Sequence, residues 1–182
     1  YSDWVGCYLF HIYFGLWPEV APAFATLDII MIMNLSLKVP TPLEYFSSLV
    51  HNDADFPLLE AAISLGQDEY PEMNVQTVLS EVDQLMGRLQ RRLPADAGPL
   101  HKLRVLNQFV YRDLGFAGNF NHFNDPDNSY IHVVLSKRLA IPISMAVIWL
   151  ELAQGLDLKV RGVSFPGHFM VKVNLSEGQV II

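Results

Sequence analysis

Two residues in the second half of the chain have the side chains and the order of a nucleophile and its base. Ser144 stands at the start of a long apolar segment, and His168 follows a Phe-Pro-Gly turn 24 positions later. In nucleophilic catalysis a histidine within hydrogen-bond reach activates a hydroxyl or thiol, and a third group orients that histidine. Ser144 and His168 are therefore our candidate catalytic pair. The alternatives are that Ser144 caps backbone N–H groups at its helix start and that His168 is a hydrogen-bonded structural histidine.

Four further polar residues stand at the edges of the same apolar segments: Asn119, Asp125, Asn128 and Arg138. Asn or Asp can orient a catalytic histidine, and Arg can bind a carboxylate. The same residue types also satisfy turn backbones or the last carbonyls of a helix. We expect Asp125 and Asn128 to brace their loop and Asn119 to be the better site candidate. Arg138 is expected to end its helix or to pair with Asp125.

A buried helix and a hairpin would have to position the candidate pair. The residues from Ser144 to Gln154 are mostly apolar, with Pro142 before them and Gly155 after them. This pattern predicts a central helix. Residues 158–163 and 168–174 alternate as strands around a turn at 165–167, and a third strand begins at residue 179. Such a hairpin would return His168 to the helix start, at a distance of roughly 2.6 to 3.2 Å from Ser144.

The first half of the chain predicts helices. Thr41 and Glu44 form a capping box, and Asn74 is a good N-cap before a strong amphipathic pattern that runs to Leu89. Further helices are expected over residues 57–65, 100–113 and 129–138, with a linker at 94–99 and a loop at 118–128. Helices followed by an antiparallel sheet indicate the α+β class.

Composition excludes several function classes. The net charge of −7 with only 12 Lys and Arg argues against nucleic-acid binding, which depends on cation–phosphate attraction. Six histidines lie without metal-ligand spacing, so we expect neither a metal nor another cofactor. Cys7 is the only cysteine, which excludes a disulfide within the chain and fits the cytoplasm.

The segment from Tyr1 to Met33 differs from the rest of the chain. Its apolar run extends only from Trp4 to Trp17. A helix that spans a bilayer needs about 20 residues, so we expect no membrane segment there. We interpret the segment as a truncated or extraneous leader, with the natural start at Met31 or Met33, in preference to a lipid-facing or partner-binding segment. The expected organisation has three parts. They are a leader (1–36) whose composition matches the rest of the chain poorly, a helical part (37–98) and a core (99–182).

Four motifs in the second half together resemble one family. They are Gly115-Phe-x-Gly-Asn119, Asp125-Pro-x-Asn-Ser-Tyr130, Arg138-x-x-Ile-Pro-Ile-Ser144 and Pro166-Gly-His-Phe169. This set resembles the bacterial SirB1 family, an uncharacterised branch of the transglutaminase-like superfamily. An upstream segment, Leu65-Gly-Gln-Asp-Glu-Tyr-Pro71, also looks like the helical part of that family.

The resemblance implies a transglutaminase-like, or cysteine-protease-like, α+β core. It places Ser144 where the superfamily has a cysteine nucleophile at a helix start, and a hydroxyl is the poorer nucleophile near neutral pH. It puts the third catalytic group at the start of the strand after Ile182. Two functions stay open. One is a pseudoenzyme that binds a protein or peptide partner or has a regulatory role. The other is a serine-dependent amide hydrolase or acyltransferase that uses Ser144 and His168.

Overall fold

The computed structural model describes residues 39–52, 56–176 and 178–182. The residues from Pro40 to Ile182 form one compact unit. The expectations for the leader, including the role of Cys7, lie outside the described residues. In the part of the chain that the structure describes, no helix is both long and apolar enough to cross a membrane.

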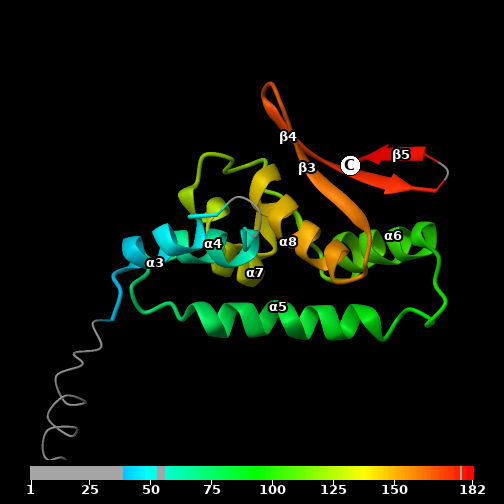
Figure 1. Ribbon diagram of the computed structural model, residues 1–182. Helices are drawn as coiled ribbons and strands as arrows, with labels where there is room; N and C mark the ends of the chain where they lie inside the picture. The colour runs from blue at the N-terminus through cyan, green and yellow to red at the C-terminus, as the bar shows by residue number, and fades with distance from the viewer. Residues whose placement is uncertain (1–38, 53–55, 177) are drawn as a thin grey trace, which may run out of the picture. The chain divides into compact units, whose positions relative to one another are not determined.

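The described chain consists of helices followed by a small antiparallel sheet, which is the predicted α+β arrangement (Figure 1). The first helical elements are α3 (Pro42–Leu49), α4 (Leu58–Ser64), η2 (Leu65–Gln67), α5 (Val75–Gln90), α6 (Pro99–Asn107) and η3 (Gln108–Asp113). The remaining elements are β1 (Ala117–Gly118), η4 (Pro126–Ser129), α7 (Ile131–Lys137), β2 (Leu139–Ala140), α8 (Pro142–Gln154), β3 (Lys159–Phe165), β4 (His168–Leu175) and β5 (Gly178–Ile181).

Helix α8 is the centre of this unit, as its apolar sequence predicts. It contacts α4, α6 and α7 and is covered by β3 and β4 of the sheet (Figure 1). Its side chains Ile148, Trp149 and Leu152 are almost completely buried. The indole of Trp149 donates a hydrogen bond to Asn107 Oδ1 at 2.9 Å, which satisfies the polar atom of a buried ring.

Helix α5 packs through the predicted stripe of apolar residues. Its buried residues alternate at spacings of three and four along the helix. They are Val75, Val78, Val82, Leu85 and Leu89. Asn74 is the N-cap, as predicted, and its side chain accepts a hydrogen bond from the Thr77 N–H at 3.0 Å. The C-terminal end of α5 carries Arg88, followed by two further arginines.

The predicted hairpin is confirmed, and it is longer than expected. Strands β3 and β4 pair antiparallel from Lys159 with Asn174 to Phe165 with His168, and β5 pairs with β4. Gly167 in the turn has a φ of 75°, a conformation that glycine adopts without strain. Val171 and Val173 are buried on the face that meets α8, as the alternation predicts.

Three local features differ from the sequence-based expectations. The expected helix over 100–113 is α-helical only to Asn107 and continues as the π-helical turn η3. The expected helix over 129–138 begins two residues later, at Ile131, because residues 126–129 form the short 3₁₀ turn η4. Strands β1 and β2 form a parallel pair of two residues each, which is too short to produce a recognisable alternation.

The N-cap of α5 provides a test of this fold. Replacing Asn74 with alanine removes the acceptor for the Thr77 N–H, so we expect Asn74→Ala to lower the free energy of unfolding by about 1 kcal/mol. Asn74→Asp keeps an acceptor and should lose much less. Urea unfolding of the three proteins measures both differences. Equal loss in the two variants would contradict a capping role.

Candidate functional site

The side chain of Ser144 is buried and faces the backbone of two other segments. Ser144 is the third residue of α8 and is only 3% exposed. Its hydroxyl lies 2.6 Å from the carbonyl oxygen of Asn128 and 3.1 Å from that of Ile141, and it donates to these acceptors. The hydroxyl therefore connects the start of α8 to η4.

Asn128 is the centre of a buried hydrogen-bond network. The residue is 3% exposed, and its side-chain amide donates to the carbonyls of His122 at 2.7 Å and Phe123 at 3.2 Å. Its Oδ1 accepts a hydrogen bond from the Asn119 amide at 2.9 Å. Because buried polar atoms need partners, this network fixes the loop between β1 and η4.

Asn119 and Asp125 also form hydrogen bonds within or next to this loop. Asn119 Oδ1 accepts from the His122 N–H at 3.3 Å, while the Asn119 N–H donates to the Ala140 carbonyl at 3.0 Å. Asp125 caps η4 by accepting from the Asp127 N–H at 3.0 Å. Asp125 and Asn128 thus have the geometry expected of bracing residues, and Asn119 shares it.

His168 lies apart from this network. It is the first residue of β4, is exposed to solvent, and pairs with Phe165 across the hairpin turn. Among the described residues, no hydrogen bond joins His168 to Ser144, whose hydroxyl is directed at the two carbonyls. The structure therefore brings Ser144, Asn128 and Asn119 together, and does not bring His168 into hydrogen-bond contact with them.

Arg138 ends α7, as expected, but its side chain does not pair with Asp125. Its backbone is left-handed, with a φ of 60°, and its N–H donates to the Val134 carbonyl at 2.9 Å. Its guanidinium lies 4.7 Å from the centre of the Phe116 ring and 3.9 Å from Glu81. Burial lowers the pKa of Arg138 from its ordinary value. This position indicates packing against an aromatic face.

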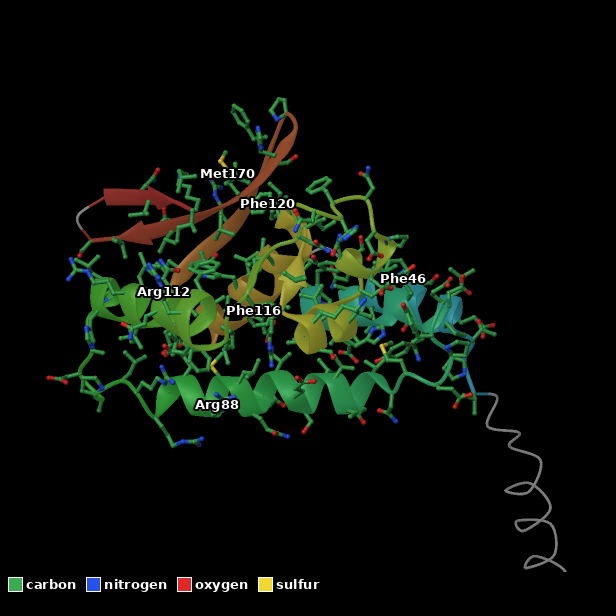
Figure 2. The ribbon with its side chains drawn as sticks, turned by 180° about the vertical axis from the view of Figure 1, so that it is seen from behind. Phe46, Arg88, Arg112, Phe116, Phe120 and Met170 are labelled. Atoms are coloured by element: carbon green, nitrogen blue, oxygen red, sulfur yellow. The ribbon has the colours of Figure 1, made fainter. Side chains whose placement is uncertain are left out.

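An apolar cavity of about 250 Å³ lies beside the start of α8. It is lined by Tyr111, Ala117, Gly118, Asn119, Phe120, Phe123, Ala140, Ile141, Pro142 and Met145. Phe120 and Phe123 are exposed by 88% and 55%, and Figure 2 shows Phe120 in the loop after β1. Burial raises the pKa of Tyr111. The sequence signal for this cavity was two phenylalanines within an otherwise polar loop.

A second cluster of hydrogen bonds connects the loop before α5 to η4. The hydroxyl of Tyr70 donates a hydrogen bond to Asp127 Oδ1, and the ammonium of Lys137 donates one to Asp127 Oδ2 at 2.6 Å. The hydrogen bond from Lys137, followed by that from Tyr70, lowers the pKa of Asp127, and the pKa of Tyr70 is raised to about 12 by its hydrogen bond to Asp127. No three His, Cys, Asp or Glu residues in the described part are grouped to hold a metal ion.

The network around Asn128 generates a stability prediction. Asn128→Ala would leave two carbonyls and the Asn119 amide without their partner, so we expect a loss of about 2 to 3 kcal/mol in the free energy of unfolding. Asn174→Ala, an exposed position on β4, is the matched control and should change it by less than about 0.5 kcal/mol. Similar losses in urea unfolding would show that the network contributes little.

The lowered pKa of Asp127 generates a prediction about pH. The ionised carboxylate stabilises the fold above the unfolded-state pKa of about 4, and this contribution is lost as the pH falls through the lower folded-state pKa. We therefore expect wild-type protein to lose stability more steeply than Asp127→Asn between about pH 5 and pH 2. Urea midpoints across this range measure the difference, and parallel curves would contradict the pairing.

Comparison with known proteins agrees with this fold. The model of a family described as the transglutaminase-like superfamily matches residues 76–182. A UPF0162 protein of Xylella fastidiosa (strain Temecula1 / ATCC 700964) is 35% identical over 135 residues, which are 72% of this chain and 47% of that protein. A UPF0162 protein of Vibrio cholerae is 28% identical over 127 residues, 68% of this chain and 47% of that protein.

Similarity also extends to a longer mammalian protein. F-box only protein 21 of Mus musculus is 37% identical over 70 residues, which are 38% of this chain and 11% of that protein. No solved structure matches the chain. The chain spans about half the length of the UPF0162 relatives it matches. Since the family model covers more than half of the chain, the chain belongs to the transglutaminase-like superfamily.

Proposed function

We propose that this domain is a SirB1-type pseudoenzyme that acts in regulation or protein interaction, with Ser144 as a structural residue. The observation that carries this proposal is the direction of the Ser144 hydroxyl, which donates to the carbonyls of Asn128 and Ile141. A serine nucleophile transfers its proton to a base as it attacks. A buried hydroxyl directed at backbone carbonyls is not aligned for that transfer.

The surroundings of His168 support the same proposal. A catalytic histidine is oriented by a hydrogen bond to its second nitrogen. In the described part of the chain, His168 is exposed and makes no side-chain hydrogen bond, while Asn119, Asp125 and Asn128 are engaged with one another and with their loop. These residues therefore support the fold of the loop and leave the histidine unoriented.

A surface suited to a partner lies next to this network. Phe120 and Phe123 are exposed beside the apolar cavity, and exposed apolar groups of this kind are typical of interaction sites. The similarity to F-box only protein 21 of Mus musculus covers 11% of that protein, as expected of a domain that functions within longer chains.

A serine-dependent amide hydrolase or acyltransferase is the second candidate function. It is favoured by the position of Ser144 at the start of a buried helix, beside a cavity that Met145 lines. Such a helix start stabilises a developing negative charge on a nucleophile. This function requires Ser144 to turn away from Asn128 and His168 to approach it.

A thiol at position 144 distinguishes the two functions. In the double variant Cys7→Ser/Ser144→Cys, the thiol at 144 is the only one, and its rate of alkylation by iodoacetamide against pH reports its pKa. We expect the added change His168→Ala to leave this profile unchanged, because His168 does not contact position 144. The Cys7→Ser protein, which has no thiol, is the control for labelling elsewhere.

The opposite result would favour the enzyme. A thiol pKa well below the ordinary value of about 8.5 that returns toward it in His168→Ala would mean that the pair is poised for catalysis. Wild-type protein should then be tested for hydrolysis of p-nitrophenyl acetate and simple amides, with Ser144→Ala as the inactive comparison.

A further inference from the structure

We propose that a groove between α7 and the loop before α5 binds a lysine- or arginine-bearing segment of a partner protein. The groove has a volume of about 650 Å³ and contains neither Ser144 nor His168. This inference goes beyond the proposed function, because it holds whichever role Ser144 has. It names the chemistry of a partner on a separate surface.

The floor of the groove is apolar and aromatic. Tyr70, Met73 and Val78 from the loop and α5 lie there together with His132 of α7. The rings of Tyr70 and His132 meet edge to face, with their centres 4.6 Å apart. Burial lowers the pKa of His132, which favours the neutral ring. A neutral, apolar floor suits the methylene groups of a long side chain.

Contacts within the domain preorganise the floor of the groove. The hydroxyl of Tyr70 is hydrogen bonded to Asp127, and the Tyr70 ring also packs edge to face against Tyr130, at 5.3 Å. His132 packs on Gly66, where a Cβ would lie only 3.2 Å from its ring. A preorganised surface loses little conformational freedom on binding.

The rim of the groove carries two carboxylates that have no ion-pair partner among the described residues. Glu69 and Glu72 line it, both are exposed, and neither makes a hydrogen bond or an ion pair with another described residue. No Lys or Arg occurs from residue 39 to residue 87, and Lys137 of α7 is already paired with Asp127. The two carboxylates therefore lack a counter-charge, and charge complementarity selects a cationic partner.

The combination of floor and rim determines which partner fits. Lys and Arg carry a charged head on an apolar stem, so the stem can lie on the floor while the head stays in water beside the carboxylates. An acidic segment would be repelled by Glu69 and Glu72. A neutral apolar side chain would meet the floor alone and leave the two carboxylates unpaired.

Fluorescence anisotropy of the whole chain with three labelled peptides tests the proposal. The peptides share a Gly-Ala background and carry two lysines, two norleucines or two glutamates at the same positions. Norleucine keeps the lysine stem without its ammonium. We expect the lysine peptide to bind at least about tenfold more tightly than either other peptide in 50 mM salt, and to weaken in 300 mM salt because the charges are exposed.

Two double variants, each of which removes two negative charges, distinguish binding in the groove from attraction to the net charge of the protein. Glu69→Gln/Glu72→Gln should weaken lysine-peptide binding at least about fivefold, whereas Asp83→Asn/Asp96→Asn, on exposed positions outside the groove, should stay within about twofold of wild type. In NMR spectra the lysine peptide should shift the backbone amide signals of residues 69, 70, 72–78 and 132. His168→Ala should bind like wild type, because His168 is exposed and does not line the groove.

Three results would overturn the proposal. They are absence of lysine-peptide binding, equally tight binding of the norleucine peptide, and equal weakening by the two double variants. The last result would show that the peptide responds to net charge alone. Circular dichroism and thermal unfolding of both double variants verify that each is folded before the peptides are compared.

Discussion

The buried amide of Asn128 is the constraint on which the second half of the structure depends. Its hydrogen bonds hold the loop after β1, and the Asn128 carbonyl accepts the Ser144 hydroxyl at the start of α8. A buried amide without partners is costly, so the loop, η4 and the helix start are fixed together. The two-residue pairing of β1 with β2 would be marginal alone, and Asn119 extends it through its bond to Ala140.

The same hydrogen bonds are the basis for our proposal that this fold, which carries the residue types of a catalytic site, serves another purpose. Ser144, Asn128 and Asn119 are the groups that a hydrolase would use for attack and orientation, and here each is engaged in holding the backbone. Engagement of this kind increases rigidity and reduces the freedom that a reacting group needs. His168, on an exposed hairpin, is outside that network.

Sequence reasoning succeeded where the pattern was long and local. Asn74 and the apolar spacing after it defined α5, and the apolar run after Pro142 defined α8. The π-helical turn η3 was not predictable, because it shares its composition with an α-helix. The site was only partly predictable, since residue types indicated Asn119, Asn128 and Ser144, whereas the direction of each hydroxyl and amide depends on contacts distant in sequence.

Basic residues are unevenly distributed around α5. Lys and Arg are absent from residue 39 to residue 87, and Arg88, Arg91 and Arg92 then gather at the far end of the helix. At the rise of an α-helix, α5 has a length of about 24 Å. Figure 2 shows Arg88 on this helix. An uneven distribution of charge makes the electrostatic field around this surface uneven, so diffusional encounters with charged partners become biased in orientation. The bias weakens as ionic strength shortens the range of the field.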